Sequence, residues 1–555
     1  MQPVELLLIS PPDYATREFR GAQPLGLAYL AAVLREYAAI PCRIHDANVN
    51  GPQPFDDLVQ ETLAFVATSQ AAGGRPVVGI SAVSQMIHTA AKLADAVKAV
   101  HPDALIILGG YHPTFAHREI LQDFPAVDLC VRGEGELTLL EIMQRWQAAA
   151  PNLVNDWSDI AGVTWRQGDE IVVNLSRANL SDLDAVPFPA RDLLPPLDAY
   201  PQYADTVAGV MRYKASIMSS RGCPFHCNFC SIIAFYGDAG GKPWRGRSVD
   251  NVVAEMVHLA DTYGASHFEF QDDNFYVRPE RALGIVEKYA ATGREFSFAF
   301  LTRADQVVRG ERYFHALRQA GLRYVSVGIE SGSEASLDRM VKQTGVEINR
   351  KALQILHDHD VAAQVEFIMF EPGSTLSDLQ ENLRFIEQQG LFGYFPPLIF
   401  GSLLLLPGTP VREQIEQATG VTGPVHDALG YVFPDPAVTT IYDLMNEFQR
   451  QQGEGWYQLA FELLDSIPAN EIALQGAGLN GDTGWYQRLL AEQKLDFFAL
   501  TRIPYAVMRD GLRAVSTGNP MPKQAILDQA ADQIRIIQQR LRSTQAELQA
   551  VLEQR

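Results

Sequence analysis

Three of the five cysteines in this 555-residue chain fall within one short segment, RGCPFHCNFCS at positions 221–231. The segment follows an apolar run predicted to be a strand, so Cys223, Cys227 and Cys230 are expected on a loop. Unpaired cysteine is normally buried in a core. Three cysteines gathered on one loop therefore indicate a metal centre.

The spacing of these thiols bears on which metal centre they form. A structural zinc site needs four ligands, usually as two pairs from separate loops. The two other cysteines, Cys42 and Cys130, lie in predicted strands, and His226 is awkwardly adjacent to Cys227. Five cysteines are also too few for a disulfide framework in a chain of this length. Three thiolates are what a 4Fe–4S cluster needs if one iron stays open to a small molecule.

The elements before the cysteine loop alternate between short apolar strands and amphipathic helices. This alternation predicts an α/β fold, a flavodoxin-like doubly wound domain over residues 1–148 that binds ligands beyond the carboxyl ends of its strands. The predicted strands are 4–10, 42–47, 77–83, 104–110 and 127–133, and the helices are 25–37, 55–67, 87–100, 118–124 and 137–146. Residues 149–205 are predicted to form a hairpin at 163–174 and a proline-rich linker.

A second alternation with longer units covers residues 206–425 and predicts a partial (β/α)6 barrel. Its expected strands, 213–220, 266–271, 295–301, 323–329, 364–370 and 398–406, each end in polar or turn-forming residues. Residues 426–555 are predicted to be mainly helical. A narrow apolar seam there favours packing on its own domain over self-association: Leu527, Ala530, Ile534, Ile537, Leu541, Thr544, Leu548 and Val551.

Composition excludes several classes of partner. A net charge of −21 argues against general affinity for nucleic acid or anionic membranes. The first residues lack the basic region of a signal peptide, and no run approaches the roughly 20 apolar residues of a membrane span. With so few cysteines, the chain is expected in the cytoplasm.

The cysteine loop resembles the signature of radical S-adenosylmethionine (SAM) enzymes, over about residues 205–415. The resemblance implies that Cys223, Cys227 and Cys230 bind three irons of a 4Fe–4S cluster while SAM chelates the fourth. Reduction of the cluster, by an electron donor such as flavodoxin or ferredoxin, then splits SAM into methionine and a 5′-deoxyadenosyl radical.

Further strand ends match the same family. FEFQDDNF (268–275) implies that Asp272 and Asp273 meet the SAM ammonium, although Asp272 alone is equally well explained as a turn or cap residue. TRAD (302–305) implies that Arg303 lies near the SAM carboxylate, and GIESGSE (328–334) places Glu330 and Ser331 near its ribose or carboxylate. EPGST (371–375) and LPGTP (406–410) resemble the fifth and sixth strand ends. Lys342 is expected on the surface.

The front domain resembles the cobalamin-binding domain fused to one branch of these enzymes. The matching pieces are QPLGLAYLAAVL (23–34), GISAVSQ (79–85), ILGGYHPT (107–114) and VRGEGE (131–136). By the resemblance, the loop from Ser81 to Met86 lies under the corrin ring and the glycine-rich loops hold the nucleotide tail. The implied cobalamin contacts are Ser81, Ser84, Gln85, Gly109, Gly110, His112, Gly133 and Glu134. Glycine lets backbone approach a bulky ligand because it has no Cβ.

One departure concerns the cobalt ligand. Domains that give cobalt a histidine carry Asp-x-His-x-x-Gly after the first strand, where this chain has PPDYATREFRG. DANVNG (46–51) has a similar outline but follows the second strand and is interpreted as an ordinary loop. His112 is expected to be a polar contact or cap. The prediction is base-off cobalamin without a protein histidine on its lower face.

These features predict a cobalamin-dependent radical SAM enzyme that methylates an unactivated carbon of a small-molecule or natural-product substrate. In that scheme one SAM methylates cobalamin, a second generates the radical, and the substrate radical takes methyl from methylcobalamin. A non-methylating reaction, such as the oxidative ring closure of bacteriochlorophyll synthesis, is the alternative. A catalytically dead cobalamin-binding protein and transfer RNA thiomethylation fit less well, the latter because it needs more cysteines. No further residue is assigned a catalytic role, and the substrate stays open.

Overall fold

A computed structural model gives the arrangement of most of the chain. It describes residues 5–14, 23–49, 51–148, 156–200, 204–205, 209–210, 214–237, 240–393, 397–420, 425–427, 429–476, 484–518 and 522–553. The chain forms two compact units. Unit 1 comprises Met1–Gln202, Arg212–Leu301 and Leu404–Gly430, and unit 2 comprises Tyr203–Met211, Thr302–Leu403 and Tyr431–Arg555.

Unit 1 begins with a parallel sheet in the order β2-β1-β3-β4-β5. The strands are β1 (Leu6–Ser10), β2 (Cys42–Asp46), β3 (Val77–Ser81), β4 (Leu105–Gly109) and β5 (Leu129–Val131). This order is that of flavodoxin-like folds, with ligand sites expected where the strand order reverses. The doubly wound first domain predicted from the sequence is therefore confirmed.

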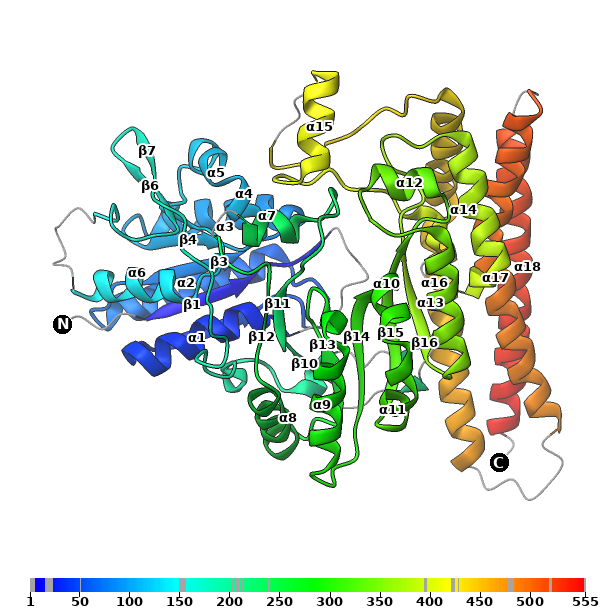
Figure 1. Ribbon diagram of the computed structural model, residues 1–555, viewed down its shortest axis with the longest axis horizontal. Coiled ribbons are helices and arrows are strands. Elements are labelled where there is room, and N and C mark those ends of the chain that lie inside the picture. Colours follow the sequence, from blue (N-terminus) through cyan, green and yellow to red (C-terminus); the bar gives the residue numbers. More distant parts are fainter. Residues whose placement is uncertain are drawn as a thin grey trace. The chain divides into compact units, whose positions relative to one another are not determined.

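Helices lie along both faces of this sheet (Figure 1). On one face α1 (Leu25–Ala38) and α6 (Glu136–Ala148) contribute Leu27, Leu139 and Trp146 to a buried apolar core. The other face carries α2 (Phe55–Ala71), α3 (Ile87–Val100) and α5 (His117–Asp123), whose apolar side chains form a second core. Burial on both faces explains why the strands are almost continuously apolar.

The hairpin predicted at 163–174 is present, and it belongs to the first sheet, which the sequence pattern did not predict. Its strands, β6 (Val163–Gln167) and β7 (Glu170–Val173), extend the sheet because β6 pairs antiparallel with β5. Trp165 and Val163 are buried in the core shared with α1 and α6. The hairpin is thus an integral part of the first sheet.

The rest of unit 1 holds the segment that carries the cysteines. Its parallel strands are β10 (Lys214–Ile217), β13 (His267–Phe270) and β14 (Ser297–Arg303), of which the last two residues of β14 belong to unit 2. Along the chain, α8 (Val249–Tyr263) precedes β13, and α9 (Pro279–Ala290) connects β13 to β14. A short antiparallel pair, β11 (Ser220–Gly222) and β12 (Trp244–Gly246), flanks the cysteine loop. Smaller elements of this unit are η1 (Ser84–Met86), α4 (Tyr111–Phe115), η2 (Arg191–Leu193), η3 (Leu197–Ala199), α7 (Ser231–Gly237), η4 (Phe275–Val277) and α15 (Pro410–Thr419).

Unit 2 contains two further parallel strands, β15 (Leu322–Glu330) and β16 (Ala362–Phe367). Helices accompany them: α10 (Ala304–Arg309), α11 (Phe314–Gln319), α12 (Glu334–Arg339), α13 (Val346–Asp358) and α14 (Leu376–Gln388). Its short elements are β8 (Ala204–Asp205), β9 (Gly209–Val210), η5 (Glu311–Tyr313), η6 (Leu391–Gly393) and η7 (Leu398–Phe400). The strand-helix repeat predicted for the second region is present here.

The predicted strand at 398–406 is wrong. The structure has the 3₁₀ helix η7 followed by a single parallel bridge from Phe370 to Ser402. Gly401 O accepts hydrogen bonds from both Met369 N and Phe370 N, and a Cβ on Gly401 would lie 2.2 Å from Phe367 O. The run is apolar because it is buried, and the glycine turn in its middle prevents a continuous ladder.

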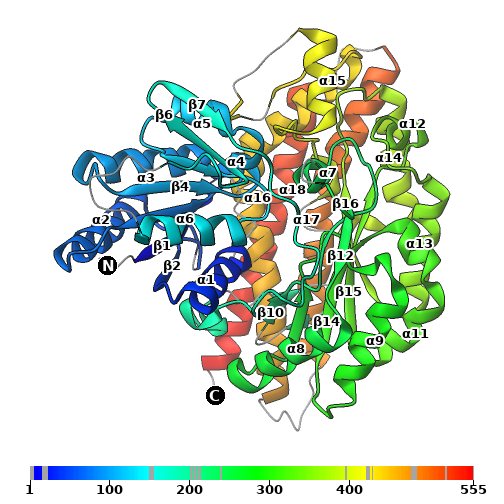
Figure 2. The ribbon, with the colours of Figure 1, turned by 60° about the vertical axis from the view of Figure 1, so that its left-hand side comes forward.

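Three long helices close unit 2, and they run side by side in both views (Figures 1 and 2): α16 (Pro436–Gly476), α17 (Gly484–Ser516) and α18 (Lys523–Glu553). The apolar seam of α18 is buried against its neighbours from Leu527 to Thr544. Packing on its own domain is therefore confirmed for this stretch. The side chains of Leu548 and Val551 lie outside the described residues. Across the described part of the chain, every helix is too short or too polar to span a bilayer.

Candidate cofactor sites

The cysteine loop leaves β11 and runs into α7. Cys227 is buried and its carbonyl accepts a hydrogen bond from Cys230 N at 3.2 Å. Burial, reinforced by the neighbouring Cys227 and Cys223 thiols, raises the pKa of Cys230 to about 12. Asn274 Nδ2 lies 3.7 Å from Cys223 Sγ and donates toward it. Across the described residues, the structure holds no ready-made group of three metal ligands, so the three cysteines share one loop without being arranged around a metal. Three cysteines on one loop are nevertheless the ligand set of a 4Fe–4S cluster that leaves one iron for SAM.

Gly222 fixes the entry to this loop. Its φ of 83° lies in the left-handed region, and a Cβ there would lie only 2.1 Å from Pro243 O. Glycine is the residue that adopts this backbone without strain. The glycine before the first cysteine is thus required by the β11–β12 pair itself.

Asp272 and Asp273 brace the same entry from the end of β13. The Asp272 carboxylate accepts hydrogen bonds from Ser219 N at 2.7 Å, Ser219 Oγ at 2.6 Å and Ser220 Oγ. Asp273 Oδ2 accepts from Gly222 N at 2.7 Å, and burial raises the pKa of the Asp273 carboxyl to about 6. Both aspartates therefore hold the strand that leads to the cysteines. Their contact with the SAM ammonium stays a prediction.

Glu134 joins the first sheet to the cysteine segment. Its carboxylate is buried and pairs with Arg221 Nη1 at 2.8 Å and Arg245 Nη1 at 2.9 Å, while Arg221 also reaches Glu136 at 2.6 Å. Burial alone would raise the pKa of Glu134, but the two guanidiniums hold that pKa below its usual range. We name Glu134, Glu136, Arg221 and Arg245 the carboxylate clamp. The Glu134 carboxylate makes its ion pairs within the protein. Its predicted contact with cobalamin stays a prediction.

Aromatic rings make a second junction between the same regions. The ring of Tyr111 in α4 lies 4.5 Å from that of Phe235 in α7, and Phe115 lies 6.5 Å from Phe235. Gly408, within LPGTP, packs closely on Phe115, since a Cβ there would lie 2.3 Å from its ring. Unit 1 thus holds the cysteine loop against the loops that follow β4 and β5 of the first sheet.

The other predicted cobalamin residues lie at the carboxyl ends of β3, β4 and β5. Gly110 has a φ of 106°, and a Cβ there would lie 2.9 Å from Ala82 O, so the space is used by the loop after β3. Gly133 also has positive φ, with nothing within 4 Å of a Cβ. Gln85 is exposed, and Ser81, Ser84 and Gly109 are partly buried. The structure brings these loops together at one edge of the sheet, where a ligand is expected.

His112 makes polar contacts, as predicted, and it does so inside unit 1. Its Nδ1 lies 2.9 Å from Ser84 Oγ and its Nε2 lies 3.0 Å from Nδ1 of His426, which in turn reaches Asp123 at 3.2 Å. Burial, with the nearby His426, lowers the pKa of His112 to about 3. Sequence reasoning missed His426 because it stands alone in a turn more than 300 residues from its partner.

The DANVNG loop has a structural role. Asn48 accepts a hydrogen bond from Asp13 N at 2.8 Å and donates to Pro11 O at 2.9 Å. It ties the loop after β1 to the loop after β2, in agreement with its interpretation as an ordinary loop. Residues 15–22 of the segment after β1 lie outside the described residues.

Unit 2 holds the other predicted SAM contacts. Arg303 is buried and donates to Asp305 Oδ1 at 2.8 Å and to Lys342 O at 2.5 Å. Glu330, with a φ of 63°, pairs with Lys342 Nζ at 2.6 Å. Lys342 is only 3% exposed, so its expected surface position is wrong: the Glu330 carboxylate compensates its buried charge.

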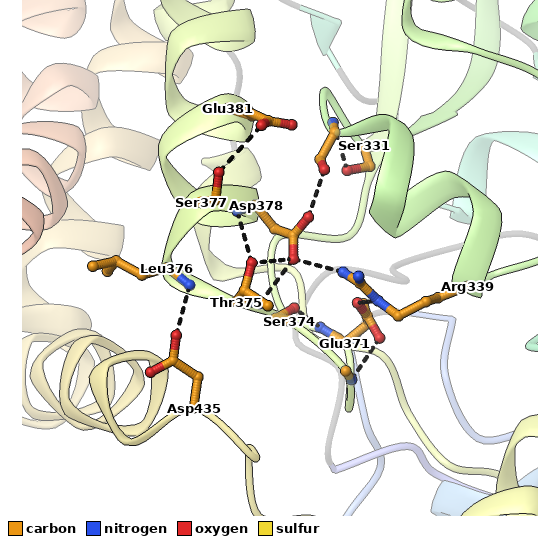
Figure 3. Close-up of polar contacts among 12 residues, drawn as sticks. Ser331, Arg339, Glu371, Ser374, Thr375, Leu376, Ser377, Asp378, Glu381 and Asp435 are labelled. Atoms are coloured by element: carbon orange, nitrogen blue, oxygen red, sulfur yellow. Dashed lines mark hydrogen bonds and ion pairs between the residues drawn. The ribbon is translucent and has the colours of Figure 1, made fainter.

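Ser331 is held by a network around the EPGST loop (Figure 3). Its hydroxyl donates to Asn382 Oδ1 at 2.7 Å and accepts from Ser333 N at 3.1 Å. Arg339 bridges Glu371 and Asp378, at 2.6 Å each, and Asp378 completes the capping box of α14 with the N-cap residue Thr375. Arg303, Glu330 and Ser331 are thus each held by polar contacts within unit 2, and their contacts with SAM stay predictions.

Comparison with known families assigns both regions. The B12 binding domain model matches residues 20–143, and the Radical SAM superfamily model matches residues 217–386. An uncharacterized methyltransferase of Pyrococcus horikoshii is 30% identical over 393 residues, which span 70% of this chain and 79% of that protein. The anaerobic magnesium-protoporphyrin IX monomethyl ester cyclase of Cereibacter sphaeroides is 29% identical over 321 residues, which span 56% of this chain and 48% of the cyclase.

A solved structure shares the fold. The cobalamin-dependent S-adenosylmethionine radical enzyme OxsB, with aqua-cobalamin and SAM bound, matches with a TM-score of 0.71 at 17% identity. The match covers 99% of this chain and 81% of OxsB. The predicted order of a flavodoxin-like cobalamin domain, a partial radical SAM barrel and a helical C-terminal region is confirmed. The chain belongs to the family of cobalamin-binding radical SAM enzymes, and its cofactors are cobalamin, SAM and a 4Fe–4S cluster.

Proposed function

We propose that the enzyme methylates an unactivated carbon of a small-molecule or natural-product substrate. The observation that carries this proposal is the junction in unit 1 between the cysteine loop and the loops after β4 and β5, made by the carboxylate clamp and the Tyr111–Phe235 contact. Methyl transfer to a substrate radical needs both cofactors at one substrate, and holding reactants together removes much of the entropic barrier. The match to a methyltransferase over 79% of its length supports the same reaction.

The residues of this chain supply binding and orientation. Cys223, Cys227 and Cys230 would hold the cluster, Asp272 and Asp273 would fix the loop that carries it, and the β3, β4 and β5 loops would hold cobalamin. When bound, the cluster with SAM supplies a 5′-deoxyadenosyl radical and cobalamin supplies the methyl group. We further propose four parts: a cobalamin-binding domain at 1–148, a hairpin and linker at 149–205, a radical SAM barrel at 206–425 and a helical region at 426–555. The hairpin of the second part completes the sheet of the first.

The enzyme also needs partners and a compartment. We propose a small flavodoxin or ferredoxin as electron donor, since the cluster must be reduced before SAM is cleaved. We propose a cytoplasmic location, where thiols stay reduced. None of the five cysteines, all of which the structure describes, forms a disulfide bond, which suits that environment. Self-association through α18 has little support, because its seam from Leu527 to Thr544 is already buried.

The test is a measurement of both SAM products. Protein purified without oxygen, with its cluster rebuilt, receives cobalamin, SAM and a strong reductant, and mass spectrometry quantifies S-adenosylhomocysteine and 5′-deoxyadenosine. We expect both products, with 5′-deoxyadenosine lost in Cys223→Ala. S-adenosylhomocysteine formation without any 5′-deoxyadenosine, from a sample with an intact cluster, contradicts the radical mechanism.

Oxidative cyclisation is the second candidate. It is favoured by one observation, the 29% identity to the magnesium-protoporphyrin cyclase over 56% of this chain. The match spans only 48% of the cyclase, whereas the methyltransferase match spans 79% of that protein, so methylation stands first. Formation of 5′-deoxyadenosine alone, with cobalamin bound and no S-adenosylhomocysteine, would reverse this order.

A further inference from the structure

A chain of four hydrogen-bonded side chains runs from a predicted cobalamin loop to the surface of unit 1. Ser84 Oγ lies 2.9 Å from His112 Nδ1, His112 Nε2 lies 3.0 Å from His426 Nδ1, and His426 Nε2 lies 3.2 Å from Asp123 Oδ2. His112 and His426 are buried, whereas the Asp123 side chain is 60% exposed. We name these four residues the imidazole chain.

The carboxylate of Asp123 together with a neutral His426 decides the direction of every bond in the chain. The carboxylate of Asp123 can only accept, so an uncharged His426 carries its single proton on Nε2 and offers the Nδ1 lone pair. His112 must then donate from Nε2, which leaves its Nδ1 as an acceptor. The remaining partner is the Ser84 hydroxyl, which therefore donates its proton to His112.

His112 cannot reverse this order by taking a second proton. Its imidazole is buried beside His426, and the ring centroids lie 5.3 Å apart. The groups that face it are Ser84, His426, His88, Arg412 and Asp427, and burial together with the other imidazoles and Arg412 keeps its pKa at about 3. His112 therefore stays neutral, with one donor and one acceptor nitrogen.

We propose that Asp123, His426 and His112 are positioning residues that turn Ser84 into a hydrogen-bond acceptor for cobalamin. With its proton committed to His112, Ser84 Oγ has only lone pairs left to offer. Cobalamin carries primary amide side chains, whose N–H groups are matching donors. This inference rests on the proposed function, because it takes the loop from Ser81 to Met86 to face the cofactor.

A neighbouring pair offers a matched control. His88 Nε2 lies 2.9 Å from Asp427 Oδ1, and the rings of His88 and His426 lie 6.3 Å apart without a hydrogen bond between them. The Asp427 side chain is 57% exposed, close to the value for Asp123. Asp427→Ala removes the same charge from the same cluster but leaves the imidazole chain intact.

The first test is a cobalamin-binding cycle on the full chain with its cluster rebuilt, titrated with hydroxocobalamin at pH 8 and followed by absorbance. We expect Ser84→Ala to raise the dissociation constant for cobalamin about fivefold, which corresponds to the loss of one neutral hydrogen bond. Asp123→Ala should weaken it about two- to threefold, because the donor and acceptor ends of the chain are no longer fixed. In the Ser84→Ala background Asp123→Ala should have no further effect, and Asp427→Ala should bind as the unaltered protein does. Equal effects of Asp123→Ala in both backgrounds would overturn the proposal.

The second test does not need cobalamin. In protein labelled with ¹⁵N-histidine, the nitrogen shifts of His112, assigned with a His112→Gln variant, report which ring nitrogen carries the proton. We expect the proton on Nε2, and a mixture of both tautomers in Asp123→Ala. A proton on Nδ1 in the unaltered protein overturns the inference about Ser84. Failure of the unaltered protein to bind cobalamin overturns the proposed function instead.

Discussion

At the scale of single residues, the absence of a Cβ at Gly222 allows the backbone turn that precedes the cysteine loop. Gly222→Ala places a methyl group 2.1 Å from Pro243 O at a φ of 83°. Backbone strain of this kind costs about 1–3 kcal/mol, and the β11–β12 pair must open to relieve the clash. We expect the variant to lose most of its cluster, as measured by iron and sulfide content after reconstitution.

The control for this prediction is Gly237→Ala at the end of α7. Nothing lies within 4 Å of a Cβ at Gly237, so the methyl group has open space. This variant should keep its iron. Equal iron contents in both variants would show that the turn before Cys223 does not position the thiols.

The sequence predicts single residues well where spacing alone carries the chemistry. The cysteine spacing pointed to the family that the comparisons established, because thiols on one loop need no knowledge of the fold. Lys342 and His426 could not be predicted in this way. Burial of Lys342 depends on Glu330, and His426 depends on His112, so each position is set by packing between distant segments.

At the scale of elements, the carboxylate clamp should contribute strongly to stability. Glu134→Gln leaves the buried guanidinium of Arg245 without its carboxylate, and breaking a buried ion pair in this way costs about 3–5 kcal/mol. Glu141 also pairs with an arginine, Arg177, but the Glu141 side chain is 44% exposed. Glu141→Gln should therefore lower the free energy of unfolding by less than about 1 kcal/mol. Denaturant unfolding followed by tryptophan fluorescence compares the two, and similar losses would contradict a buried clamp.

The clamp also predicts a pH dependence. The pKa of Glu134 is held below its usual range in the folded protein, so its ion pairs stabilise the fold above the ordinary glutamate pKa of about 4.3. That stabilisation is lost as the pH falls through the folded-state pKa. The difference in unfolding free energy between the unaltered protein and Glu134→Gln should therefore be full at pH 7 and shrink toward acid pH. A difference that grows in acid would contradict this sign.

The sequence predicts the type of an element correctly where the apolar periodicity is clear. The prediction is wrong where a turn interrupts an apolar run. The strands β1 to β5 and the helices between them follow from alternation of the two patterns. Residues 398–406 have the same apolar composition but turn at Gly401, whose carbonyl is shared by two backbone donors. Apolar composition reports burial, whereas the ladder depends on backbone geometry that composition does not encode.

At the scale of the whole molecule, α18 is predicted to stabilise unit 2 without forming oligomers. Leu541 is fully buried in the seam, so Leu541→Ala should cost about 2–4 kcal/mol. Ile536 is 53% exposed on the same helix, and Ile536→Ala should cost less than about 1 kcal/mol. Thermal unfolding measures the loss, and sedimentation velocity should show an unchanged mass for both variants. A fall in mass for Leu541→Ala would show that the seam joins two copies.

The hairpin of β6 and β7 has a consequence for synthesis on the ribosome. The first sheet gains its edge strand and the core residues Val163 and Trp165 only after this segment has been made. A nascent chain that stops at the end of α6 would leave β5 as an open edge, which invites pairing with other chains. Because domains fold in order as they emerge, the cysteine segment, which comes later, would be added to an already completed first sheet.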